Sequence, residues 1–136
     1  MSPPIDNESG STRQCPTVLV VDDFDLLREL IRHLLASADV QVLEASSGAE
    51  ALAVAAACEQ TPRVLITDMH LPDCSCIELA AQLRLRWPGL KTLVISSDPS
   101  GDLVARAIPE AKFLEKTLLA DRLVQRVREL LGTASQ

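Results

Sequence analysis

The stretch "TVLVVDDFD", residues 17–25, decides how the rest of this chain is interpreted. Four consecutive apolar residues predict a buried strand, and they run directly into Asp22 and Asp23. Adjacent carboxylates repel each other, and partial burial raises the free energy of both unless a cation compensates. Two interpretations are open at this point. Either one carboxylate caps a helix while the other is solvated, or the pair holds a metal ion.

The composition indicates one globular domain with an aliphatic core. The 136 residues are 47% hydrophobic and 24% charged, and the aromatic residues are two Phe and one Trp. The net charge of −6 argues against a nucleic-acid-binding surface, because such a surface needs clustered Lys and Arg. No apolar run approaches the ~18 residues of a membrane span, and the N-terminus lacks the apolar region of a secretory signal. We therefore expect a cytoplasmic protein that binds neither nucleic acid nor membrane.

From Thr17 onward, five short apolar runs alternate with five segments of helical periodicity. The predicted strands cover residues 17–21, 40–45, 63–67, 90–96 and 112–115. The predicted helices cover residues 25–38, 48–60, 76–87, 102–108 and 119–132. Strict alternation is typical of an α/β fold in which helices cover both faces of a parallel sheet. We expect residues 17–132 to form this domain, residues 1–16 a flexible N-terminal tail, and residues 133–136 a C-terminal tail.

Polar side chains follow four of the predicted strands at their carboxyl ends, where the functional crevice of an open parallel sheet lies. Asp22 and Asp23 follow the first strand, Asp68 the third, Ser96 the fourth and Lys116 the fifth. Three converging carboxylates need a cation among them, and Mg²⁺ suits their oxygens. A carboxylate beside Mg²⁺ and a lysine can accept a phosphoryl group, because both cations neutralise charge on the transferring oxygens.

Together these motifs resemble the receiver domain of two-component response regulators, and "VVDDFDLLREL" is especially similar to the first strand and helix of the chemotaxis receiver. The resemblance covers roughly residues 17–131 and implies a five-stranded parallel sheet in the flavodoxin-like order 2-1-3-4-5. The matching positions are Asp22 and Asp23 for the acidic pair, Asp68 in "VLITDMHLP" for the phospho-acceptor, Ser96 for the switch hydroxyl, Lys116 in "FLEK" for the lysine, and Phe113 for the switch aromatic.

The resemblance implies a role for each residue at this sheet edge. Asp68 would accept a phosphoryl group from a histidine kinase or a histidine phosphotransfer protein. Asp23 and Asp68 would ligate Mg²⁺ through their side chains, Asp22 partly through water, and His70 through its backbone carbonyl. Ser96 and Lys116 would bind the new phosphoryl group. The protein would then be a self-catalysing phospho-acceptor rather than an enzyme with another substrate.

The resemblance also implies how the signal leaves the site. Inward movement of Ser96 would open space into which Phe113 turns. The face formed by the fourth helix, fifth strand and fifth helix would then change and bind a downstream protein. We expect a stand-alone receiver, since only "GTASQ" follows Leu131, and either a monomer or a phosphorylation-dependent dimer. We also hypothesise that His70 and Asp98 set the rate of autodephosphorylation.

Three features depart from the family pattern. Cys76 stands where the family usually has Gly, a position that tends to need permissive backbone angles, so it suggests either a reshaped loop after the third strand or a turn that tolerates a residue other than Gly. Thr117 stands where the family has a Pro in a cis peptide, so we expect a trans Lys116–Thr117 bond. The segment between Ser96 and Lys116 is short, which predicts a trimmed fourth helix. These departures leave a second interpretation open, namely a pseudo-receiver that binds proteins without being phosphorylated.

Two enzyme or ligand-binding classes fit the sequence less well. Phosphatases with an aspartate nucleophile typically show D-x-D after a strand, whereas this chain has "DMH" at residues 68–70. A nucleotide-binding fold would need a Gly-rich phosphate loop after the first strand, and "DDFD" follows it here.

Overall fold

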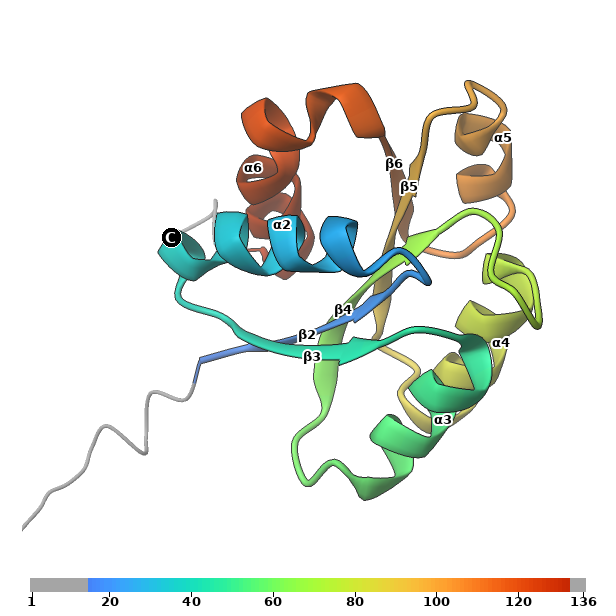
Figure 1. Cartoon of the computed structure of the whole chain (residues 1–136). Helices are drawn as coiled ribbons and strands as arrows, with labels where there is room; N and C mark the ends of the chain where they lie inside the picture. The colour runs from blue at the N-terminus through green and yellow to red at the C-terminus, as the bar shows by residue number, and fades with distance from the viewer. Residues whose placement is uncertain (1–14, 133–136) are drawn as a thin grey trace, which may run out of the picture.

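The apolar runs form a five-stranded parallel sheet between two layers of helices in the computed structural model, which describes residues 15–132 (Figure 1). The predicted tails, 1–16 and 133–136, fall largely or wholly outside the described residues. The strands are β2 (Thr17–Val21), β3 (Gln41–Ala45), β4 (Pro62–Asp68), β5 (Lys91–Ser96) and β6 (Ala111–Glu115). Their spatial order, β3-β2-β4-β5-β6, is the predicted order 2-1-3-4-5, which confirms that prediction.

The helices are divided between the two faces of the sheet. One face is covered by α2 (Asp25–Leu35) and α6 (Leu119–Leu131), and the other by α3 (Gly48–Ala57), α4 (Cys76–Arg86) and α5 (Gly101–Arg106) (Figure 1). Two short 3₁₀ turns, η1 (Ala36–Ala38) and η2 (Lys116–Leu118), follow α2 and precede α6.

Alternating residues of each strand build two separate cores. In β2, Val18 and Val20 pack toward α2 and α6, whereas Leu19 and Val21 pack toward α3 and α4. Side chains of successive strand residues point to opposite faces, so an uninterrupted apolar run supplies both cores at once. This two-sided burial explains why the sequence of β2 shows no polar alternation.

Side-chain caps set the start of two helices. Ser75 and Glu78 form a reciprocal capping box at the start of α4. Ser47 accepts a hydrogen bond from the Glu50 N–H at the start of α3. Gly132 ends α6 with a left-handed φ of 80°, which glycine adopts without a Cβ penalty.

Several predicted boundaries shift by one to three residues. The second predicted helix was expected to reach Gln60, but α3 ends at Ala57. Its chain must become extended before β4 starts at Pro62, and a residue that precedes proline avoids the helical region. The fourth predicted helix is short, as expected from the trimmed segment, since α5 has 6 residues. None of the described helices is long and apolar enough to cross a membrane.

Cys76 does not need permissive backbone angles. It is the first residue of α4, it is buried, and it is not among the described residues with positive φ, which are Asp39, Glu110 and Gly132. The capping box at Ser75 starts the helix immediately before it. The loop after β4 therefore accommodates a side chain at this position without backbone strain, which agrees with the second of the two alternatives, a turn that tolerates a residue other than Gly.

Candidate functional site

Three carboxylates meet at the carboxyl edge of the sheet. Each of Asp22, Asp23 and Asp68 offers an oxygen, and these oxygens all lie within 4.8 Å of one another. Asp68 is the last residue of β4, and the acidic pair follows the last residue of the adjacent β2. The parallel register, with Val21 opposite Thr67, ends both strands at the same level. The structure therefore brings together the three residues that the sequence predicted to converge.

Asp22 is the buried member of the cluster. Its exposed fraction is 2%, whereas Asp23 is exposed and Asp68 is half-buried. Burial raises the pKa of Asp22, the hydrogen bond from the Phe24 N–H at 2.8 Å lowers it, and the charge of Asp68 raises it further. The backbone N–H of Asp22 also donates to the carbonyl of Ala45 at 3.1 Å. A buried carboxylate with such neighbours favours a bound cation.

Lys116 reaches the acidic cluster from the end of β6. Its Nζ lies 3.4 Å from Oδ1 of Asp68. No cis peptide bond occurs in residues 15–132, so the Lys116–Thr117 bond is trans, as expected. The 3₁₀ turn η2, which begins at Lys116, carries the chain from β6 to α6. The replacement of the family's Pro by Thr117 therefore leaves the lysine at the cluster.

Oxygen donors of this kind fit a magnesium ion. Mg²⁺ prefers carboxylate and carbonyl oxygens at about 2.1 Å, so oxygens on opposite sides of the ion lie about 4.2 Å apart. The three oxygens of the cluster all lie within 4.8 Å of one another, so they are close enough for one ion to contact them together. His70 lies two residues beyond Asp68 on the loop after β4, and its side chain is exposed. The group of His70 that is expected to ligate Mg²⁺ is its backbone carbonyl.

Ser96, Phe113 and Gly101 form a contact at the end of β5. Ser96 is buried, and its hydroxyl accepts a hydrogen bond from the Asp98 N–H at 2.9 Å. A Cβ on Gly101 would collide with the Phe113 ring, meeting Cδ1 at 2.8 Å, and would lie 3.2 Å from Cβ of Ser96. The ring therefore rests directly against the first residue of α5. Only glycine permits this close approach.

Sequence reasoning missed one residue that holds the loop after β4. The carboxylate of Asp73 accepts hydrogen bonds from the backbone N–H groups of Gly48 and Ala49, both at 2.8 Å. These bonds lower the pKa of Asp73 and place its charge at the N-terminus of α3, where the helix dipole favours an anion. The two partners lie far apart in sequence, so no local pattern marked this contact.

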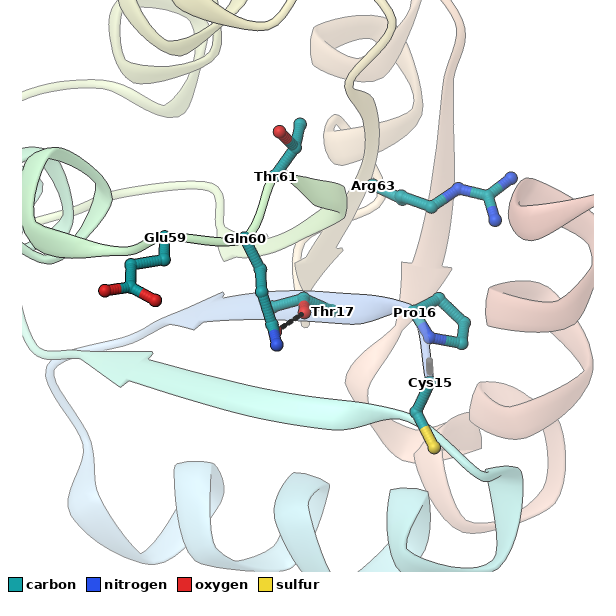
Figure 2. Close-up of a pocket in the computed structure, with 7 residues that line it drawn as sticks. All are labelled: Cys15, Pro16, Thr17, Glu59, Gln60, Thr61 and Arg63. Atoms are coloured by element: carbon teal, nitrogen blue, oxygen red, sulfur yellow. Dashed lines mark hydrogen bonds between the residues drawn. The ribbon is translucent and has the colours of Figure 1, made fainter. Parts of the chain in front are cut away.

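A hollow lies at the opposite edge of the sheet, beside the first residue of β2 (Figure 2). The side chain of Thr17 hydrogen-bonds to Gln60 at 2.8 Å, and Arg63 donates to the Leu131 carbonyl at 3.1 Å. The hollow is lined by Cys15, Pro16, Thr17, Glu59, Gln60, Thr61 and Arg63. It contains none of the residues predicted for the functional site, because those lie at the carboxyl ends of the strands and these lie at the amino ends.

The comparison with protein families agrees with this arrangement. A family model for the response regulator receiver domain matches residues 18–128. The chain belongs to this family. Because the chain contains a receiver domain and its relatives are response regulators, it belongs to two-component signalling.

Two relatives and one solved structure show how far the similarity extends. The transcriptional regulatory protein KdpE of Mycobacterium tuberculosis is 34% identical over 113 residues, which cover 82% of this chain and 49% of KdpE. The chemotaxis protein CheY of Listeria monocytogenes is 29% identical over 111 residues, or 79% of this chain and 92% of CheY. The structure of the chemotaxis response regulator CheY4 of Vibrio cholerae matches this one with a TM-score of 0.75 and 24% sequence identity. The match covers 85% of this chain and 98% of the CheY4 chain, and it supports the assignment of the fold. The chain thus spans about half the length of a relative such as KdpE.

Proposed function

We propose that this protein is a phosphorylation-dependent switch whose receiver domain, residues 17–132, accepts a phosphoryl group on Asp68 in a Mg²⁺-dependent reaction. One observation carries the proposal. Three carboxylate oxygens lie within 4.8 Å of one another, and Nζ of Lys116 lies 3.4 Å from Asp68. With one lysine, the cluster has a formal charge of −2, which a divalent cation would neutralise. The side chains of Asp22, Asp23 and Asp68 and the carbonyl of His70 would hold that ion.

In the proposed reaction, a carboxylate oxygen of Asp68 attacks the phosphorus atom of a phosphohistidine. A P–O bond forms, the P–N bond breaks, and the histidine nitrogen leaves with the electron pair. When bound, Mg²⁺ supplies positive charge to the oxygens of the transferring group. Lys116 now pairs with Asp68 and would move its charge to a phosphoryl oxygen. The hydroxyl of Ser96, which now accepts from the Asp98 N–H, would donate to another.

The contact between Phe113 and Gly101 supports a role in output. If the hydroxyl of Ser96 turns toward the phosphoryl group, it would leave space between Ser96 and Gly101, the first residue of α5. The Phe113 ring would then turn inward and change the face formed by α5, β6 and α6. This face would bind the downstream protein or a second copy of the chain, and a histidine kinase or histidine phosphotransfer protein would supply the phosphoryl group.

Intact-mass measurement tests the proposal. The protein is incubated with acetyl phosphate and Mg²⁺, alongside the variants Asp68→Asn and Asp121→Asn. Asp121 is an exposed carboxylate on α6 and serves as a charge-matched control. One phosphoryl adduct is expected on the parent and on Asp121→Asn, and none on Asp68→Asn or in EDTA.

The outcomes separate the candidate functions. An adduct that persists in Asp68→Asn would show that the acceptor is another residue. No adduct on the parent, with either acetyl phosphate or a phosphorylated histidine phosphotransfer protein, would favour the pseudo-receiver, which binds proteins without phosphorylation.

A further inference from the structure

The guanidinium of Arg28 joins three parts of the chain beside the acidic pair. Its Nη1 donates to the backbone carbonyl of Asp22 at 2.6 Å, and its Nε donates to Glu44 of β3 at 3.3 Å. Its Nη2 donates to Asp25 in the first turn of α2. The Arg28 side chain is 15% exposed, so most of it is shielded from water. A planar guanidinium can make these bonds together because its donors point in fixed, divergent directions.

The loop that Arg28 contacts has few other anchors. The Asp22 carbonyl belongs to the peptide unit that joins Asp22 to Asp23. On one side of this unit, the Asp22 N–H is tied to β3 through Ala45, and on the other the Phe24 N–H is tied to the Asp22 carboxylate. No side chain of the described residues caps the start of α2 at Phe24. These two bonds hold the residues on either side, and the hydrogen bond from Arg28 is the one that holds the carbonyl of the peptide unit itself.

We propose that Arg28 is a positioning residue that orients the Asp22–Asp23 peptide, so that both carboxylates point toward the Mg²⁺ site. This inference rests on the proposed function, because it concerns the same site. Groups outside the ligand set that orient the ligands typically change metal affinity by about 10–100-fold when they are removed. Arg28 would act in this way through the backbone, without touching the ion.

A purely electrostatic role for Arg28 predicts the opposite result. Arg28 and Arg32 carry two positive charges, and their partners Asp25 and Glu44 carry two negative ones. Removal of Arg28 leaves this group with a net charge of −1. If charge alone mattered, the added negative potential would tighten Mg²⁺ binding. If orientation matters, binding weakens, so the sign of the change distinguishes the two roles.

Arg32 provides a matched control. It lies one helical turn beyond Arg28 on α2, and its Nε pairs with the same Glu44 at 3.0 Å. Its side chain is 54% exposed. Arg32→Ala therefore removes the same charge from the same group. In the described structure, no bond joins its side chain to the Asp22 carbonyl.

The experiment is a Mg²⁺ titration at constant ionic strength, in which backbone amide chemical shifts in NMR spectra report binding. The proteins compared are the parent, Arg28→Ala, Arg28→Lys and Arg32→Ala. Arg28→Lys keeps the charge and the aliphatic stem, so it carries the test if Arg28→Ala does not fold. The Kd for Mg²⁺ is expected to rise about tenfold in both Arg28 variants. In Arg32→Ala it is expected to stay within about twofold of the parent value or to fall.

Unchanged or tighter Mg²⁺ binding by the folded Arg28 variants would overturn the positioning role alone. A parent that does not bind Mg²⁺ would overturn the proposed function, and the positioning role with it. Equal weakening in Arg32→Ala would also overturn the positioning role, because it would trace the effect to the lost pairing with Glu44.

Discussion

Replacement of the buried Asp22 by Asn is expected to stabilise the metal-free protein while it removes a ligand of the proposed Mg²⁺ site. Asn can keep the hydrogen bond from the Phe24 N–H, which now reaches the Asp22 carboxylate at 2.8 Å. The substitution removes a charge that is 2% exposed and lies beside two other carboxylates. Function and stability therefore conflict at this residue, as is common at sites built from like charges.

The size of the gain follows from the geometry. Two unit charges no more than 4.8 Å apart repel each other by at least ~3.5 kcal/mol at an effective dielectric constant of about 20. The attraction of Asp22 to Lys116 opposes this repulsion. We expect a net increase in the free energy of unfolding of about 1–2 kcal/mol, which raises the melting temperature by roughly 3–8 °C for a domain of this size.

The pH dependence provides a second test of the same reasoning. The pKa of Asp22 is raised above its ordinary value of 3.8, chiefly by burial. Its ionised form therefore destabilises the folded state. The advantage of Asp22→Asn should be complete above the raised pKa and should vanish as the pH falls toward 3.8.

Thermal unfolding in EDTA measures this difference, with Glu59→Gln as a control that removes an exposed charge at the opposite edge of the sheet (Figure 2). Saturating Mg²⁺ should reverse the order of stabilities, because a ligand at 100 times its Kd stabilises the parent by about 2.7 kcal/mol. An Asp22→Asn protein that is no more stable than the parent at pH 7 in EDTA would refute the argument from burial and repulsion.

Three further predictions concern the switch contact, the loop after β4 and phosphate loss. Gly101→Ala should lower the free energy of unfolding by about 1–3 kcal/mol in urea denaturation, since its Cβ collides with Phe113; the same change in a Phe113→Ala background should have little effect, and equal losses would exclude the collision. Asp73 has a lowered pKa because it accepts two backbone hydrogen bonds, so its stabilising effect is present above pH 3.8 and disappears as the pH falls through the lowered pKa. The melting temperature of the parent should therefore fall more steeply on acidification than that of Asp73→Asn, and parallel curves would contradict this. His70→Ala and Asp98→Ala should each slow the loss of phosphate from phosphorylated protein several-fold, and unchanged rates would remove both residues from that step.

The period of the apolar residues was enough to predict the alternation of strands and helices, and the resemblance to receiver domains supplied the strand order. The strand β2 is buried on both faces, so its sequence is an uninterrupted apolar run, whereas the helices α2 and α6 keep one polar face. Burial acts on each element separately, and its pattern is therefore visible locally in the sequence. The end of a strand is also visible locally, as the point where the apolar run stops. Because parallel strands end at the same edge of a sheet, Asp22, Asp23 and Asp68 could be placed at one edge before their distances were known.

The family pattern predicted less well where this chain departs from it. Cys76 left open whether the loop after β4 is reshaped or simply tolerates a side chain, and the capping box of α4 makes the position helical. Thr117 replaces the family's Pro, and the ion pair with Asp68 shows that Lys116 still reaches the cluster. In both cases the neighbouring structure decides the geometry, and the residue type alone does not.

Contacts between distant parts of the chain were decided by the tertiary structure. Arg28 reaches Glu44 of β3, Asp73 reaches the start of α3, and Phe113 rests on Gly101. A sequence pattern reports which side of an element is buried, but not which side chain on another element it will meet. That depends on how helices pack across the sheet, and therefore on the fold as a whole. For this protein, the sequence by itself determined the sheet and the acidic edge, and only packing determined which residues hold that edge in place.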